Sequence, residues 1–361
     1  EAHVKLLTPV RPGDRFFLPL LATEDGRPIA QANVRIVRSS DCSVEDVTMY
    51  SGCNGMDFGI GRNEGLITLR GVKIMLKPGS RNQTTTWRDG MHFKDNRIGP
   101  VIEDCYFEGL QDDSINISAS TAMAAQQVSP TEFLLVGVQF DPGDRVLVCH
   151  PTSGRRTETV VQSSERRPGA LLRVVLKDPV GDVVPGRKQE TDVLSTHFYN
   201  MTYANDGFVV RNCTFKPQRI RAILVRGCHG LVEGNTIEGV GGHGIAMLNE
   251  IGYFYEGPFP RDCVIRNNTI RNTQGYPILI GTSLSSRAPK VAQTGNIRVE
   301  NNTIQTRPQQ SAIVVNVAEN VAITGNRILD PDGKEIGRKG IRVANSTNVS
   351  VSDSATPNQT Q

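Results

Sequence analysis

Aspartates recur at matching positions of two similar segments in the first third of the chain. The segment WRDGMHF (87–93) contains Asp89, and QDDSINI (111–117) contains Asp112 and Asp113, with 24 residues from Asp89 to Asp113. Three carboxylates held close together repel one another, so the pKa of at least one should rise. A protonated carboxyl beside an ionised carboxylate can hydrolyse a glycosidic bond, because the first protonates the leaving oxygen and the second activates water or attacks the sugar. We therefore predict Asp89, Asp112 and Asp113 as catalytic residues.

Two other interpretations of these aspartates compete with catalysis. Asp-Gly and Asp-Asp are common turn residues, which a repeat would stack without any chemical role. Carboxylates also suit a hard cation such as Ca²⁺. We favour catalysis because the two acidic segments also share polar residues that are expected to face outward, His92 and Asn116. We expect neither a metal nor a cofactor.

Several residues around the aspartates are predicted to bind a sugar. Arg221 and His243 continue the column of Asp89 and Asp113 on later coils. The loop NEIGYFYEGPFP (249–260) lengthens its coil, and such loops often form the walls of a cleft. Each of these residues is also common as a solvated side chain or as loop packing. The predicted substrate-binding residues are Asp57, Trp87, His92, Asn116, Arg221, His243, Glu250, Tyr255 and Glu256, with Tyr253 as a further stacking candidate.

An internal repeat indicates which elements would bring these residues together. Short apolar strands followed by a polar turn recur along the chain as VEDVTM (44–49), LRGVKI (69–74), IEDCYF (102–107), VRNCTF (210–215), VEGNTI (232–237), IRNNTI (265–270), VENNTI (299–304) and ITGNRI (323–328). The column of their fourth residues advances by 25, 33, 108, 22, 33, 34 and 24 residues and consists of Val47, Val72, Cys105, Cys213, Asn235, Asn268, Asn302 and Asn326. Such a period with short strands is typical of a β-solenoid. We expect the asparagines to hydrogen-bond along the stack and the two cysteines to be buried free thiols.

A second set of segments aligns without gaps: NGMDF (54–58), DGMHF (89–93), DSINI (113–117), RAILV (221–225), HGIAM (243–247), YPILI (276–280), SAIVV (311–315) and KGIRV (339–343). Their third and fifth residues are apolar and are predicted to face inward, while the fourth faces outward. We therefore predict an all-β fold, a right-handed parallel β-helix that spans 33–118 and 201–350.

One step of the repeat is long enough to hold an inserted module. The step of 108 residues corresponds to one coil plus about 80 further residues, and 119–200 contain β-patterned stretches at 138–150 and 170–178. We predict a small β-barrel or sandwich at 119–200. Residues 1–32 are predicted to be a β-rich segment, as part of a second barrel-like module.

The composition excludes several classes of protein. A chain of 361 residues with 38% hydrophobic content can bury a large core. No apolar run approaches the ~18 residues of a membrane span, and no basic run with interleaved aromatics indicates nucleic-acid binding. The seven cysteines lack a CxxC pair, which argues against a structural zinc site. The chain begins with Glu1 and shows no signal peptide, as expected of a mature or trimmed product.

Specific motifs resemble a known enzyme family. DGMHF (89–93), IEDCYFEGLQDDSIN (102–116), the β-rich insertion and later coils with a YEGP loop together resemble the α-1,3-galactosidases of glycoside hydrolase family 110, over roughly 40–330. The resemblance implies removal of terminal α-1,3-linked galactose from a carbohydrate partner, with inversion and without a metal. It implies that Asp89, Asp112 and Asp113 form the acid and base machinery. A secreted or periplasmic location is inferred from this substrate class, and a homodimer is a further expectation.

Two alternatives to an exo-acting hydrolase remain at this point. The first is another carbohydrate-active β-helix, such as a polygalacturonase-like hydrolase or a uronate lyase. A lyase needs a Lys or Arg base and usually Ca²⁺, whereas polygalacturonases carry an Arg-x-Lys arrangement that this sequence lacks. The second is a non-enzymatic, glycan-binding β-helix, whose function would not change with Asp113→Asn.

Overall fold

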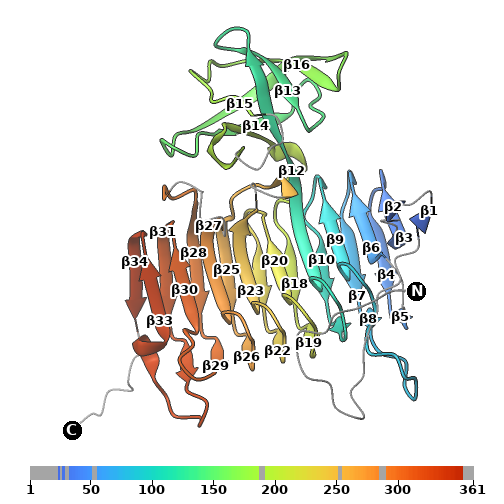
Figure 1. Ribbon diagram of the computed structural model, residues 1–361, viewed down its shortest axis with the longest axis vertical. Coiled ribbons are helices and arrows are strands. Elements are labelled where there is room, and N and C mark those ends of the chain that lie inside the picture. Colours follow the sequence, from blue (N-terminus) through green and yellow to red (C-terminus); the bar gives the residue numbers. More distant parts are fainter. Residues whose placement is uncertain are drawn as a thin grey trace, which may run out of the picture.

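Short parallel strands wind into a β-helix, from which an antiparallel module projects (Figure 1). The computed structural model describes residues 23–24, 27–28, 32–50, 55–186, 192–250, 254–283 and 290–352. The predicted N-terminal segment 1–32 lies outside these residues, apart from Ala32 and a short antiparallel pair, β1 (Thr23–Glu24) and β2 (Arg27–Pro28). The described residues also include three short 3-10 helices, η1 (Asp192–Leu194), η2 (Met201–Tyr203) and η3 (Gly337–Gly340).

Three parallel sheets run along the solenoid, and most coils give one strand to each. The first sheet contains β4 (Cys42–Glu45), β7 (Ile67–Arg70), β10 (Val101–Glu103), β18 (Val209–Arg211), β21 (Leu231–Glu233), β25 (Arg261–Arg266), β28 (Thr294–Glu300), β31 (Ala318–Thr324) and β34 (Thr347–Ser352). The second contains β5 (Thr48–Met49), β8 (Lys73–Ile74), β11 (Tyr106–Phe107), β19 (Thr214–Phe215), β22 (Thr236–Glu238), β26 (Thr269–Arg271), β29 (Thr303–Gln305) and β32 (Arg327–Leu329). The parallel part of the third contains β3 (Ala32–Val37), β6 (Met56–Gly61), β9 (Met91–Lys94), β12 (Ile115–Gln127), β20 (Ile223–Val225), β23 (Ile245–Asn249), β27 (Ile278–Ser283), β30 (Ile313–Asn316) and β33 (Ile341–Ala344).

The turn between the first and second sheets explains the Asp, Asn and Gly residues of the repeat. One residue in each coil adopts a left-handed conformation there, which Gly, Asn and Asp tolerate best. These residues are Asp46, Gly71, Asp104, Asn212, Gly234, Asn267, Asn301 and Gly325. The next residue points inward and forms the predicted column. Its asparagine amides are linked by hydrogen bonds of 2.8–2.9 Å from Asn235 to Asn326, and Cys105 and Cys213 are buried free thiols.

The predicted register is confirmed for every coil but the first. Strand β12 pairs with β9 and β20 so that Ile115 lies beside Met91 and Ile223. In contrast, Phe58 lies beside Met91, where the gap-free alignment had placed Met56. The apparent match of NGMDF with DGMHF therefore hid a shift of two residues. Such a shift keeps the inward and outward alternation intact, so the sequence pattern could not reveal it.

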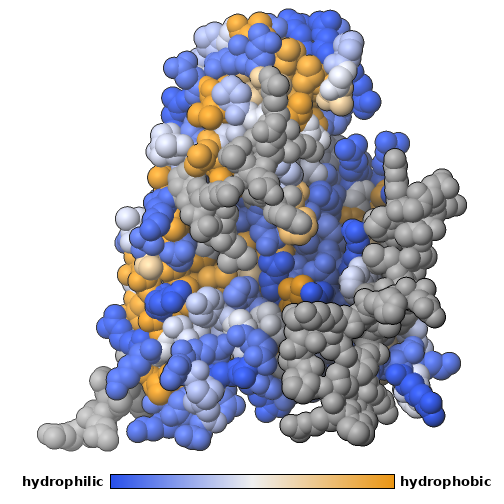
Figure 2. All heavy atoms as spheres, viewed as in Figure 1, coloured by the Kyte–Doolittle hydropathy of each residue, from blue (hydrophilic) through white to orange (hydrophobic). Residues whose placement is uncertain are grey.

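The outward side of the third sheet is only partly as expected. Fourth-position residues of the later coils do point away from the lumen, but all except the exposed Arg342 are buried in a separate apolar cluster of Leu224, Ala246, Leu248, Leu279 and Val314. Figure 2 shows mainly hydrophilic residues over the middle coils and hydrophobic residues over the C-terminal coils. Between Asn116 and Arg342, the fourth-position residues of this face are apolar, so the coils of Leu224 to Val314 differ from the coils that carry the aspartates.

The inserted module is a small closed barrel. Strand β12 leaves the solenoid and pairs with β13 (Glu132–Val136), and the ring continues through β16 (Leu171–Leu176), β15 (Arg156–Arg167), β14 (Arg145–Cys149) and β17 (His197–Asn200) back to β12. Closure leaves no free sheet edge. The module has an apolar core of its own, separate from the lumen of the solenoid. The prediction of a β-helix with an inserted β module is confirmed.

Candidate active site

The repeat places the three aspartates side by side. Because Met91 pairs with Ile115, Asp89 and Asp113 precede neighbouring strands by the same two residues, and the Gly90 amide donates to the Asp113 carbonyl at 2.9 Å. One carboxylate oxygen of each of Asp89, Asp112 and Asp113 lies within 4.8 Å of the others. Asp89 and Asp113 are 7% and 2% exposed, whereas Asp112 is half-buried. Solvent and ligand can therefore reach the cluster most easily at Asp112.

Burial and mutual repulsion raise the pKa of two of these carboxyls. Burial, followed by the nearby Asp89 charge, raises the pKa of Asp112 from 3.8 to about 6. Burial also raises the pKa of Asp113 to about 7; the Arg221 charge opposes this shift, while Asp89 and Asp112 add to it. Near neutral pH, this pair can hold a proton next to a third carboxylate, as general acid and base catalysis requires.

Asp89 is oriented by a histidine and an amide. The His92 Nδ1 atom lies 2.8 Å from Asp89 Oδ2, and the Asn116 amide donates to the same oxygen at 3.3 Å. Burial lowers the pKa of His92, but the hydrogen bond to Asp89 and the charges of Asp89 and Glu256 outweigh burial, so that its pKa is raised. A positive charge on His92 in turn helps to lower the pKa of Glu256.

Asp113 is held by a chain of buried ion pairs. Arg221 donates from Nε to Asp113 at 2.8 Å and from Nη1 to Glu250 at 2.9 Å. Glu250 also pairs with Arg226, which is fully buried and donates to Asn116 at 2.8 Å and to Glu256 at 2.7 Å. Removing one partner from such a buried network leaves another charge uncompensated. The two arginines therefore fix the positions of Asp113 and Asn116.

Glu256 closes the network on the side of Asp89. It lies in β24 (Glu256–Gly257), which pairs antiparallel with β12 just beyond the site. Lys94 donates to it at 2.9 Å, and His92 Nε2 lies 3.6 Å from it. The nearby cations, with Arg226 first among them, overcome the effect of burial and lower the pKa of Glu256. The loop of 249–260 thus supplies two acids that brace the site from outside the solenoid.

The structure brings together most, but not all, of the predicted site residues. Trp87 is half-buried next to the first aspartate segment. His243 stacks on Tyr276 and accepts a hydrogen bond from its amide at 2.9 Å, and burial lowers the pKa of His243 to about 4. Tyr255 is half-buried, and its carbonyl accepts from the Thr121 amide at 2.9 Å. Tyr253 lies outside the described residues.

The prediction that Asp57 lies in the outward file of His92 is wrong. The two-residue shift places Gly59 beside His92, and Asp57 is fully buried, where it accepts a hydrogen bond from Asn33 at 2.8 Å. Its side chain thus contacts an earlier coil, while its backbone amide donates to the Asp89 carbonyl at 3.2 Å.

Two members of the network were missed by sequence reasoning. Lys94 and Arg226 each come directly after an aligned five-residue segment, and the pairing of β12 places both beside Ser118. By the alternation of a strand, this sixth position faces outward, like His92 and Asn116. Extending the alignment by one residue would have found them.

The aspartate oxygens are also the ligands that Ca²⁺ prefers. However, one Asp113 oxygen already accepts from the Arg221 guanidinium, whose positive charge opposes a cation at the same place. The donor set therefore fits proton transfer better than metal binding.

No helix within the described ranges is long and apolar enough to cross a membrane.

Comparisons with known proteins agree with the fold and with the motifs. A family model described as a right handed beta helix region matches residues 200–358. An alpha-1,3-galactosidase B of Akkermansia muciniphila is 24% identical over 95% of this chain and 44% of its own length. A second alpha-1,3-galactosidase B, from Bacteroides thetaiotaomicron, is 24% identical over 83% of this chain and 50% of its own length. The chain thus spans about half the length of the curated relatives it matches, and the predicted resemblance to α-1,3-galactosidases is confirmed.

Proposed function

We propose that this chain is an exo-acting glycoside hydrolase that removes terminal α-linked galactose from glycans or polysaccharides. The observation that carries the proposal is the cluster of Asp89, Asp112 and Asp113, in which two carboxyls have raised pKa values beside a third carboxylate. This is the arrangement that glycoside hydrolysis requires. The similarity to curated alpha-1,3-galactosidases supports galactose as the sugar and α-1,3 as the linkage.

The geometry favours a distinct role for each aspartate. Asp112 is the most accessible, its pKa is about 6, and no cation among the described residues lies within ion-pair distance of it. It is the proposed general acid, which protonates the leaving oxygen. Asp89, oriented by His92 and Asn116, is the proposed base. Asp113, buried against Arg221, is the proposed positioning residue, and its backbone amide donates to Asp112 at 3.1 Å.

Inversion at the anomeric carbon is part of the proposal. It rests on the resemblance to family 110, because the closest carboxylate oxygens alone do not measure the separation that distinguishes inverting from retaining enzymes. Proton NMR of the first product tests it. We expect β-galactose from an α-galactoside before mutarotation, whereas α-galactose as the first product would contradict it.

Leaving groups of different basicity test the roles of the aspartates. A dinitrophenolate leaves without a proton, so Asp112→Asn should retain most activity on dinitrophenyl α-galactoside and lose about 10²- to 10⁴-fold on an α-1,3-linked disaccharide. Asp89→Asn should lose activity on both substrates, because activation of water is still required. The matched control is Asp332→Asn, in an exposed turn far along the chain, which should change neither rate. Equal losses for Asp112→Asn on both substrates would contradict its role as the acid.

Chelator treatment and ultraviolet absorbance, together with the hydrolysis assays, separate the rival functions. A uronate lyase would be inactivated by a chelator and would generate an unsaturated, ultraviolet-absorbing product. A non-enzymatic glycan-binding protein would hydrolyse neither galactoside. Export from the cytoplasm and formation of a homodimer stay predictions from the sequence.

A further inference from the structure

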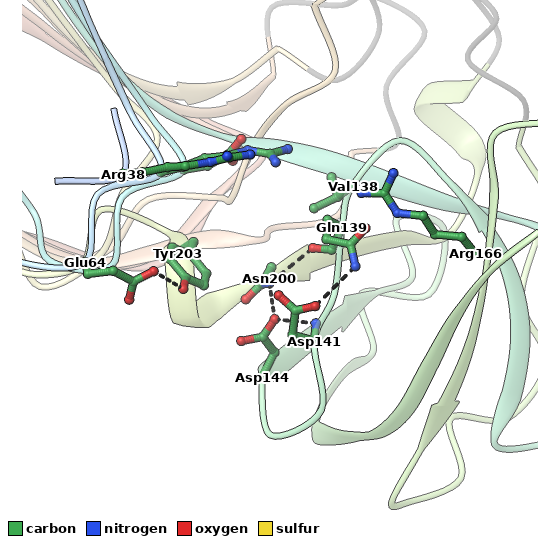
Figure 3. A pocket seen from close by; sticks show the side chains of 11 residues that line it. Arg38, Glu64, Val138, Gln139, Asp141, Asp144, Arg166, Asn200 and Tyr203 are labelled. Atoms are coloured by element: carbon green, nitrogen blue, oxygen red, sulfur yellow. Dashed lines mark hydrogen bonds between the residues drawn. The ribbon is translucent and has the colours of Figure 1, made fainter. Parts of the chain in front are cut away.

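Two clefts follow one another along the N-terminal coils, starting at the proposed active site. The first, of about 260 Å³, is lined by His92 and Lys94 and by the outward glycines Gly59 and Gly61. The second, of about 440 Å³, lies between the solenoid and the barrel (Figure 3). Val37, Gly61 and Lys94 are adjacent in the sheet and line the first cleft, while the residues that directly follow them line the second. The clefts are therefore consecutive along the same coils.

Glycines form the floor of the first cleft. Gly59 and Gly61 occupy the positions of β6 that correspond to His92 and Lys94 of β9. A Cβ on Gly61 would lie 2.8 Å from the Lys94 carbonyl oxygen, and a Cβ on Gly59 would lie 3.0 Å from the Ala32 Cβ. Both positions therefore require glycine, and because both residues are half-exposed and line the cleft, their backbone forms part of its surface. A flat ligand such as a sugar ring can approach it closely.

The second cleft offers unpaired cations. Arg38 and Arg62 reach it from the solenoid, and Arg166 reaches it from the barrel. None of these three side chains makes a hydrogen bond or an ion pair with any residue that the structure describes. Figure 3 shows Arg38 and Arg166 on opposite sides of the cleft.

The acids of this cleft, in contrast, are already engaged. Tyr203 and Arg97 donate to Glu64 at 2.5 and 2.9 Å. Asp95 accepts from the Ser120 amide and hydroxyl at 2.6 and 2.8 Å. The other two acids accept within the barrel, Asp144 from Asn200 at 2.7 Å and Asp141 from Gln139 at 3.2 Å. Among the described residues, only Glu64 of these acids is paired with a cation, so the other three acids keep their charge. Their oxygens already accept from protein donors, whereas the guanidinium groups of Arg38, Arg62 and Arg166 remain free to donate hydrogen bonds to a ligand.

We propose that the substrate is an acidic oligosaccharide whose inner units cross the glycine floor and place an anionic group against Arg38, Arg62 and Arg166. The anion is a sulfate ester or a uronate carboxylate, which guanidinium groups bind through paired hydrogen bonds. This inference rests on the proposed function, because the terminal galactose must occupy the aspartate cluster while the inner units extend toward the barrel. It assigns to the barrel a role in choosing the substrate.

Calorimetry with three matched ligands tests the proposal. The ligands are galactose-terminated trisaccharides that differ only in the inner unit, which is neutral, sulfated or a uronate, and Asp89→Asn is the background that prevents turnover. We expect the preferred acidic ligand to bind about tenfold more tightly than the neutral one at low salt. Adding Arg62→Ala and Arg166→Ala should remove this preference and leave neutral binding unchanged. The stronger of the two acidic ligands identifies the anion.

Controls make the outcome specific. Arg338→Ala removes an equally exposed arginine from η3 at the other end of the solenoid and should preserve the preference. Equal affinity for all three ligands, or a preference that survives the double substitution or disappears with Arg338→Ala, would overturn the inference. Hydrolysis by the unsubstituted protein is measured separately: hydrolysis without charge preference overturns only this inference, and charge preference without hydrolysis overturns only the proposed enzyme.

Discussion

At the scale of single residues, the raised pKa that suits Asp112 to act as an acid also destabilises the folded protein at neutral and alkaline pH. Its pKa is raised from 3.8 to about 6, so between these values the folded state binds more protons than the unfolded state. Stability therefore falls as the pH rises through this range and stays lowered above it. Asp112→Asn should increase the free energy of unfolding by about 1 to 3 kcal/mol at pH 8 and by almost nothing near pH 4.

Denaturant unfolding at the two pH values measures this effect. Asparagine can still accept the Asp113 amide hydrogen bond, now 3.1 Å long, so the change isolates the charge. Asp332→Asn, in an exposed turn, should show the same stability as the unsubstituted protein at both pH values. If Asp112→Asn increases the free energy of unfolding by the same amount at pH 8 and at pH 4, then ionisation of Asp112 does not destabilise the folded protein.

The same carboxyl determines how activity depends on pH. A general acid works only while protonated, so kcat/KM on an α-1,3-linked disaccharide should fall about tenfold per unit of pH above about 6 to 7. On dinitrophenyl α-galactoside, which needs no proton, this alkaline decline should be weak. Parallel declines for both substrates would mean that a different group, such as His92, controls the profile.

At the scale of elements, the repeat could be predicted from the sequence because each coil needs the same types of residue at the same positions. The left-handed turn demands Gly, Asn or Asp, and the following inward position stacks, so both columns were visible in the sequence. The register of β6 could not be predicted from the sequence, because a shift of two residues preserves the alternation of inward and outward residues. The partners of Arg226 could not be predicted either, since Glu250 and Glu256 come from a loop whose path no periodicity describes.

The asparagine column gives an element-scale prediction. Asn268 donates to Asn302 and to the Val232 carbonyl at 2.9 and 3.0 Å and accepts from Asn235 at 2.9 Å. Asn268→Ala would leave buried partners on both sides unsatisfied, so we expect a loss of about 2 to 4 kcal/mol in the free energy of unfolding. Asn326→Ala, at the half-buried end of the column, should lose clearly less. Equal losses in chemical denaturation would mean that the column acts by packing alone.

At the scale of the whole molecule, the barrel contacts the loop behind the proposed active site, and Tyr199 lies at the centre of this contact. Tyr199, on β17, is buried against Phe259, and its hydroxyl accepts from Asn249 at 3.1 Å. Asn249 directly precedes Glu250, which holds both arginines of the site, and Gly257 packs so closely on the Tyr199 ring that a Cβ would overlap it. The barrel therefore supports the loop that carries the acids behind the aspartates.

This connection predicts that two equally destabilising cavities differ in their effect on catalysis. Tyr199→Ala and Phe140→Ala each remove a fully buried ring and should each lower stability by about 3 to 5 kcal/mol. Phe140 lies in the core of the barrel, away from the loop, so its loss should leave kcat unchanged at temperatures where the variant is folded. Tyr199→Ala should reduce kcat at least tenfold at the same temperatures, and Tyr199→Phe, which keeps the ring, should restore most of it. If both cavities reduce kcat equally, the barrel supports the site only through global stability, and the path from Tyr199 to Glu250 carries no specific effect.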